Sequence, residues 1–194
     1  MNLNLDAFIE ALYEDMDGKV TSVALNSSTL DIQLEYDDLL VPRGQRSVTI
    51  RCADPKEIEV KPDFIGSLNF VQEHPLLWNH SGPQAQLFFS SAPSSPAEVF
   101  YLAHKVLEAE FAGWRKPSDY LNGKPEVFCS HLSGGYGLLA RGPLRPMTAL
   151  ANALGSLVAT NLVPSHNAET SLSVLTLESQ FVVCRSVEVL SNDG

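Results

Sequence analysis

The sequence has few cysteines and no long apolar segment. Its three cysteines, Cys52, Cys129 and Cys184, are odd in number and widely spaced, so we expect no disulfide framework and a reducing, cytoplasmic environment. Apolar runs such as 99–103 and 181–184 are far too short to span a bilayer. The first residues have neither a basic region nor an apolar core, so no secretory signal is expected there.

Catalytic, metal-binding and nucleotide-binding motifs are also missing from the sequence. No Gly-x-Ser-x-Gly or H-E-x-x-H pattern occurs, and we predict neither a metal nor a cofactor. In the segment 133–142 (SGGYGLLARG), Gly137 and Gly142 are separated by four residues as in a P-loop, but Pro143 stands where lysine is required. A hairpin turn explains this segment better. Cys129 and His131 are too few for a metal site, so an apolar thiol and a satisfied imidazole are favoured.

Positive charge is scarce, above all at the front of the chain. The net charge over 194 residues is −10, and an acidic protein repels nucleic acid and anionic membranes, which makes both poor partners. Up to residue 38 the only cation is Lys19. The same stretch contains nine carboxylates: Asp6, Glu10, Glu14, Asp15, Asp17, Asp31, Glu35, Asp37 and Asp38.

The apolar periodicity of the first half predicts one helix and then closely spaced strands. Apolar residues recur at helical spacing over 5–16. Alternation then predicts a hairpin of 20–25 with 30–36 and further strands at 46–52 and 67–71. Short turns between such strands are typical of an antiparallel meander. The serine-rich turn at 90–96 suggests a domain boundary, with regions 1–90 and 91–194, and one continuous domain of 1–194 is the alternative.

The second half predicts helices on a sheet. Ser95-Pro96-Ala97-Glu98 is a capping box with proline at the first helical position, so a helix is expected to begin there. A second helix is expected over 147–161, a hairpin of 127–132 with 136–141, and strands at 84–90, 172–177 and 181–190. The fold class predicted is α+β: an antiparallel β meander followed by a helix-backed antiparallel sheet with ferredoxin-like (split βαβ) strand order.

The acidic N-terminal region supports our first functional hypothesis, a non-enzymatic interaction protein. Like charges at i, i+4 spacing and carboxylates near a helix C-terminus destabilise the helix that carries them. A basic protein partner would relieve this repulsion. In size and charge alone, the chain resembles bacterial immunity proteins. A solvated acidic face is the simpler alternative. The residues expected to bind the partner are Asp6, Glu10, Glu14, Asp17, Asp37 and Asp38.

The segment 73–80 (EHPLLWNH) supports an alternative hypothesis, a small-molecule-binding protein or enzyme. It places His74 and His80 around an apolar anchor that ends in Trp78, and His131 is a further candidate for the same pocket. A loop in which Leu77 and Trp78 fill the core is the structural alternative. A homodimer that buries an apolar sheet edge or helix face is a third possibility.

Overall fold

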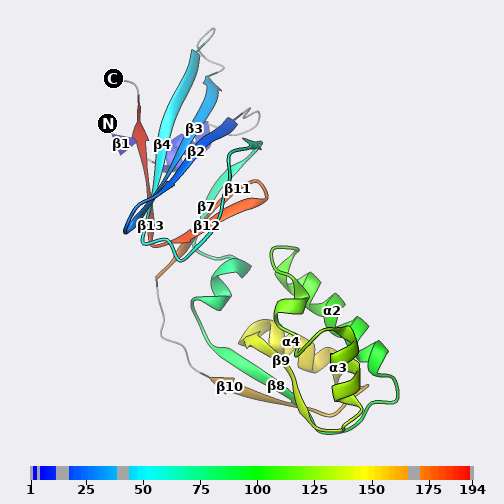
Figure 1. Cartoon of the computed structure of the whole chain (residues 1–194). Coiled ribbons are helices and arrows are strands. Elements are labelled where there is room, and N and C mark those ends of the chain that lie inside the picture. The colour runs from blue at the N-terminus through cyan, green and yellow to red at the C-terminus, as the bar shows by residue number, and fades with distance from the viewer. Residues whose placement is uncertain (1, 4, 12–17, 39–43, 166–170, 193–194) are drawn as a thin grey trace. The chain divides into compact units, whose positions relative to one another are not determined.

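The chain forms an α+β fold in two compact units (Figure 1). The computed structural model describes residues 2–3, 5–11, 18–38, 44–165 and 171–192. Unit 1 comprises Met1–His74 and Ser171–Gly194, and unit 2 comprises Pro75–Thr170. The boundary suggested by the serine-rich turn at 90–96 lies inside unit 2.

Unit 1 contains two antiparallel sheets. The larger has the order β1 (Asn2–Leu3), β13 (Ser186–Ser191), β4 (Gly44–Ala53), β3 (Thr29–Asp38), β2 (Gly18–Leu25) and β6 (Phe64–Ile65). The smaller has the order β5 (Glu57–Glu59), β12 (Gln180–Cys184), β11 (Ser173–Leu177) and β7 (Leu68–Val71). The predicted meander is confirmed for β2, β3 and β4, because each pairs antiparallel with the next along the chain.

The two sheets share one hydrophobic core. Ile32 and Ile50 of the larger sheet and Leu175 and Val182 of the smaller are fully buried in the same cluster. Helix α1 (Leu5–Ala11) adds Phe8, whose ring meets Tyr36 edge-on at 5.7 Å between centroids. Alternation along β3 therefore buries its apolar side chains between the sheets, as the sequence predicted.

Two cysteines lie at the point where the chain passes from one sheet to the other. Cys184 ends β12, and β13 begins two residues later in the larger sheet. The Arg185 N–H donates to the Ala53 carbonyl at 2.9 Å, which brings Cys184 next to Cys52. Both thiols are free and buried. The neighbouring sulfur of Cys184 and burial raise the pKa of Cys52, so this thiol stays protonated at neutral pH.

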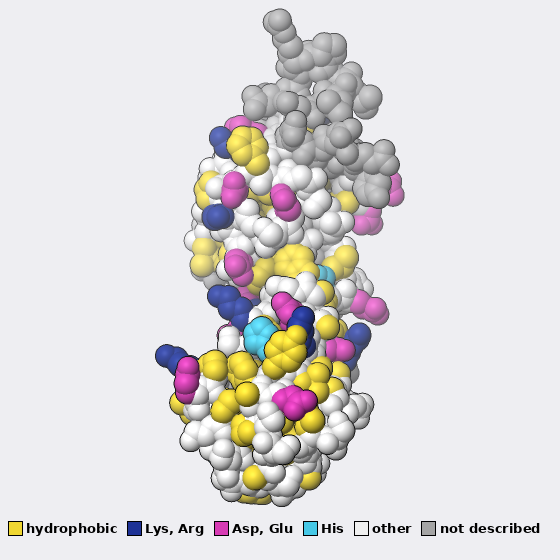
Figure 2. Space-filling model, turned by 90° about the vertical axis from the view of Figure 1, so that its right-hand side faces the viewer, with side chains coloured by type: hydrophobic (Ala, Val, Ile, Leu, Met, Phe, Trp, Pro, Cys, Tyr) yellow, Lys and Arg dark blue, Asp and Glu magenta, His cyan; other side chains and the backbone are white. Residues whose placement is uncertain are grey.

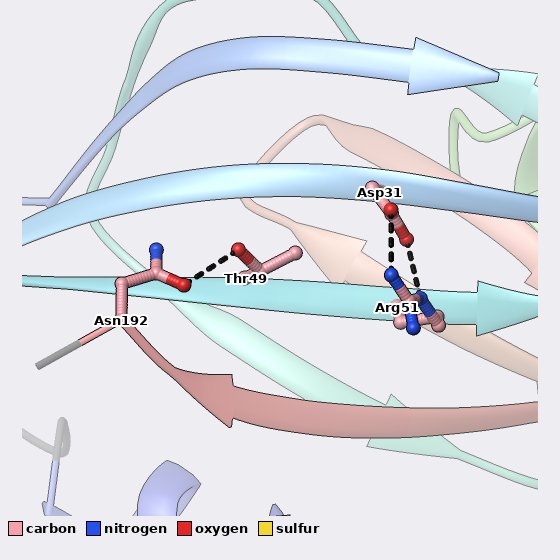
Figure 3. A network of polar contacts seen from close by, with 4 residues as sticks. All are labelled: Asp31, Thr49, Arg51 and Asn192. Carbon is pink, nitrogen blue, oxygen red and sulfur yellow. Dashed lines mark hydrogen bonds and ion pairs between the residues drawn. The ribbon is translucent and has the colours of Figure 1, made fainter. Parts of the chain in front are cut away.

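Polar side chains on the outer face of the larger sheet join distant segments (Figure 3). Arg51 on β4 donates to both carboxylate oxygens of Asp31 on β3, at 2.7 and 2.9 Å. These hydrogen bonds from Arg51 lower the pKa of Asp31. Thr49 donates to the Asn192 side chain at 3.0 Å, which attaches the end of β13 to β4. Asp31, one of the nine front carboxylates, is thus neutralised within unit 1.

Unit 2 consists of a three-stranded antiparallel sheet with helices over one side (Figure 1). The strand order is β10 (Thr160–Ser165), β8 (Gln84–Phe89), β9 (Gly137–Pro143), and the helices are α2 (Pro96–Phe111), α3 (Pro125–Leu132) and α4 (Leu144–Leu154). Two 3₁₀ helices, η1 (Pro75–Asn79) and η2 (Pro117–Asp119), complete it. Leu87, Phe89, Leu107 and Leu150 belong to its own buried core.

Helix α2 begins as its capping box predicts. Ser95 has extended dihedral angles, and its hydroxyl accepts a hydrogen bond from the Glu98 N–H at 3.3 Å. Pro96 occupies the first helical position. The helix ends at Ala112 in a left-handed conformation, with φ of 49°. The buried stripe of Val99, Ala103, Leu107 and Phe111 then packs on the sheet.

The ferredoxin-like strand order is not confirmed, because the segment expected as a strand over 127–132 is helix α3. Pro125 takes the first helical position and Glu126 lies in the first turn, both of which favour a helix. Phe128 and Leu132 bury one side at i, i+4 spacing, whereas Val127 is 60% exposed. The predicted hairpin partner is instead strand β9, which pairs with β8.

Removing the α2 cap should destabilise unit 2. The substitution Ser95→Ala leaves the Glu98 N–H without its side-chain acceptor, so we expect the free energy of unfolding to fall by about 1 kcal/mol. Urea denaturation measures this free energy of unfolding. Ser94→Ala, at an exposed neighbouring position outside the helix, is the control and should change stability by less than about 0.5 kcal/mol. Equal effects of the two substitutions would contradict the cap.

The Asp31–Arg51 pair should make stability depend on pH. Because the folded-state pKa of Asp31 is lowered, the pair stabilises the fold above the unfolded-state value of about 3.9 and is lost as pH falls through the lower folded value. At pH 6, Asp31→Asn should cost about 0.5–1 kcal/mol, since the pair is partly exposed. Urea titrations should show this difference shrinking between pH 5 and pH 2.5. Gln33→Asn, an uncharged change at an exposed position of β3, should lack the pH-dependent difference.

Candidate functional site

The segment from Pro75 to Asn79 positions the candidate site. Pro75 begins the 3₁₀ helix η1, and Leu76 and Leu77 are buried, so this short helix is anchored in unit 2. Trp78 is half-buried, and its ring lies 5.7 Å from that of Phe111 on α2. The Gln84 side chain donates to the Trp78 carbonyl at 2.7 Å. The tryptophan is therefore held by packing and by hydrogen bonding, while part of its surface stays open.

A cavity of about 560 Å³ lies beside Trp78. We call it the Trp78 cavity. Its walls come from η1, the turn after it, the end of α2 and one face of α4. The exposed areas of the wall are mainly apolar, and the volume is in the range of ligand pockets. The lining residues are Trp78, Ser81, Gly82, Pro83, Glu110, Pro143, Leu144, Arg145, Thr148, Ala149 and Asn152.

Helix α4 supplies one wall because its two faces differ. Met147, Leu150 and Leu154 are buried in the core of unit 2. Arg145, Ala149 and Asn152 follow one another at i, i+4 and i+3 spacing, so they share the opposite stripe of the helix and line the cavity. The amphipathic pattern of α4 thus separates core from cavity.

One charged pair lies at the cavity wall. The Arg145 guanidinium is over the indole of Trp78, 4.8 Å from the ring centroid. Its Nε lies 3.4 Å from Oε2 of Glu110. This carboxylate oxygen is buried and has no hydrogen-bond partner. The Arg145 side chain is 73% exposed, whereas that of Glu110 is 26% exposed, so the cation of the pair lies outermost and the carboxylate lies further in.

The histidines expected around Trp78 do not line this cavity. His74 is half-buried at the end of the first segment of unit 1. His80 follows η1, and its N–H donates to the Leu77 carbonyl at 2.9 Å. His131 is exposed at the end of α3, where its ring meets Phe89 edge-on at 5.4 Å. A Cβ at Gly137 would overlap the His131 imidazole, so this glycine allows the ring to lie against the backbone.

A second, polar cavity of about 370 Å³ lies in the same unit. It shares structural elements with the Trp78 cavity, because consecutive residues line the two: Trp78 and Asn79, Pro83 and Gln84, Gly142 and Pro143. Three short stretches of backbone therefore form a common wall. The polar cavity contains Arg115 and Arg141, neither of which the sequence singled out. No local motif marks them, since they become neighbours only through the fold.

The acidic front face is described only in part. Asp6 and Glu10 are exposed on α1, which has no basic residue in its last turn. Glu14 and Asp17 lie outside the described residues. Asp37 and Asp38 end strand β3 opposite Gln45 and Gly44, and their side chains are not described. Over the described residues drawn in Figure 2, acidic and basic side chains are interspersed. The docking face therefore stays a prediction.

The described residues contain neither a metal-binding cluster nor a helix suited to cross a membrane. Within them, no group of three or more His, Cys, Asp or Glu side chains is arranged to hold a metal ion. No described helix has both the length and the apolar character of a bilayer span. No family model, curated protein or solved structure matches this chain.

Proposed function

We propose that this protein binds a small molecule through the Trp78 cavity. The observation that carries the proposal is the combination of an apolar cavity of about 560 Å³ with a buried carboxylate oxygen, Oε2 of Glu110, that is ion-paired with the exposed Arg145 at 3.4 Å but lacks a hydrogen bond. Buried polar atoms in folded proteins are nearly always hydrogen-bonded. An unsatisfied one at the edge of an apolar cavity is well placed to accept a donor from a ligand.

The walls define the chemistry of the ligand. Trp78, Leu144 and Ala149 offer apolar contact surface, and an indole face favours a flat ring. Glu110 can accept a hydrogen bond from an N–H group. Arg145 covers both groups in the unliganded protein, and its exposed side chain can swing aside when the ligand enters. The ligand is accordingly a flat, mainly apolar molecule that carries an N–H donor.

Flat heteroaromatic amines should bind and report on Trp78. We expect 2-aminoquinoline, used as a probe, to bind with Kd on the order of 0.1–1 mM, as is usual for a ligand of this size. Its isostere 2-methylquinoline lacks the N–H group and should bind about tenfold more weakly. The measurement is indole fluorescence in a Trp114→Phe variant, which leaves Trp78 as the only tryptophan.

Two variants separate the cavity from non-specific binding. Ala149→Phe places a ring in the cavity and should abolish the fluorescence change. Ala97→Phe, the same substitution at an exposed position of α2, should leave it intact. Thermal unfolding checks that both variants fold. Equal binding by both variants, or no response to any of a panel of such amines, would overturn the proposal.

A second proposal retains the acidic face as a docking site for a basic protein. The observation that favours it is that Asp6 and Glu10 are both exposed at i, i+4 spacing on α1. Two like charges there disfavour the isolated helix by about 0.2–0.5 kcal/mol. A cationic partner would remove this repulsion and would be steered by the field. This face belongs to unit 1, so it is independent of the Trp78 cavity.

Charge reversal tests the acidic face. The triple substitution Glu10→Lys, Glu14→Lys and Asp17→Lys should abolish capture of basic proteins at 50 mM salt, because the attractive field is reversed. The control is Glu98→Lys, Glu108→Lys and Glu126→Lys, which makes the same change in net charge at exposed positions of unit 2. Unchanged capture by the first triple variant, or capture that does not depend on salt concentration, would contradict this proposal.

A further inference from the structure

The polar cavity of unit 2 lies beside strands β8 and β9 of the three-stranded sheet, and residues facing either side of this sheet line it. Residues that alternate along β8 point to opposite faces, so Ala85 and Leu87 enter the core while Gln84 and Gln86 face outward. Arg141 on β9 pairs directly with Gln86 and therefore shares its outer face. The outward-facing Gln86 and Arg141 thus line the cavity together with the core-facing Ala85 and its pair Gly142.

Ordered residues from three other segments close the cavity. Tyr120 stacks on Phe111 with ring centroids 4.4 Å apart, and its hydroxyl accepts a hydrogen bond from the Asn79 side chain at 2.8 Å. A Cβ on Gly142 would lie 2.6 Å from Tyr120 Cδ1, so this glycine allows the ring to approach β9. Arg115 donates to the Leu76 carbonyl at 3.5 Å. The walls are therefore preorganised before any ligand arrives.

Charges of both signs line this cavity without pairing with each other. Arg141 and Asp119 are both exposed lining residues. Within the described part of the chain, neither side chain forms an ion pair or a hydrogen bond. Arg115 adds a second guanidinium, which is held in place. An anion alone would meet the repulsion of Asp119, and a cation alone that of the two arginines.

We propose that the polar cavity binds a small zwitterion of the amino-acid type. Its carboxylate would lie between the guanidinium groups of Arg115 and Arg141, which suit planar carboxylates. Its ammonium group would face Asp119, and the carboxamides of Asn79 and Gln86 offer further donors and acceptors. A volume of about 370 Å³ is ample for a free amino acid and part of its hydration.

Calorimetric titration with each of the twenty common L-amino acids, on the full chain, tests the proposal. At least one should bind. For the tightest binder, the analogue without the amino group and the analogue without the carboxylate should each bind at least tenfold more weakly. Arg141→Gln and Asp119→Asn should each weaken binding of the amino acid at least tenfold. Both positions are exposed, so the variants should fold.

Glu110→Gln is the matched control, because it alters the Trp78 cavity and not the polar one. It should leave amino-acid binding unchanged while weakening the binding of the flat amines. The proposals for the Trp78 cavity and for the polar cavity can therefore fail separately. Three results would overturn the zwitterion site: no binding by any amino acid, equal binding of the deaminated analogue, or equal binding by Arg141→Gln. The second result would indicate a simple anion site.

Discussion

The architecture depends on the pairing of β7 with β11. These strands are neighbours in the smaller sheet of unit 1, with Val71 opposite Val174, yet unit 2 lies between them in the sequence. Closing a flexible loop of roughly a hundred residues costs about 4 kcal/mol of chain entropy. Unit 2 has a separate core, so its folding shortens the loop that this pairing must close. Unit 1 can therefore accommodate the whole of unit 2 as an insertion between two adjacent strands.

Within unit 2, one wall serves two different surfaces. The backbone at Trp78–Asn79 and at Gly142–Pro143 contributes one residue to an apolar cavity and the next to a polar cavity. Helices α2 and α4 contribute to the apolar cavity, and strands β8 and β9 contribute to the polar cavity. Both cavities depend on the packing of Phe111, which meets Trp78 at 5.7 Å and Tyr120 at 4.4 Å. This aromatic cluster fixes the wall from the core side.

The sequence predicted those parts of the fold that have a strong local signal. The hairpin of β2 and β3 follows from strict alternation, and the start of α2 follows from its capping box. Helix α3 was mistaken for a strand because Val127–Leu132 is short and contains apolar residues at both periods; Pro125 was the missed signal. The break between β12 and β13 was also missed: 181–190 was predicted as one strand, whereas Arg185 separates two strands of different sheets.

The candidate sites were less predictable than the fold. Trp78 stood out because its segment, 73–80, combines a tryptophan with two histidines. Its partners Glu110 and Arg145, however, come from helices distant in the sequence. Local spacing cannot reveal such neighbours, because only the packing of α2 against α4 brings them together. The histidines singled out in the sequence do not line the Trp78 cavity: His80 belongs to a turn and His131 to the end of α3. A short segment can therefore draw attention to one residue, but it does not reveal which distant residues lie beside that residue in the fold.

The contact of His131 with Gly137 also restricts how this chain can diverge. Gly137 has φ of +157°, and a side chain there would overlap the imidazole. A substitution at this position therefore meets two obstacles: a backbone conformation that L-residues rarely adopt, and an imidazole that would have to turn away. Removing the imidazole would relieve only the second obstacle, so glycine remains the favoured residue at 137 whatever residue stands at 131.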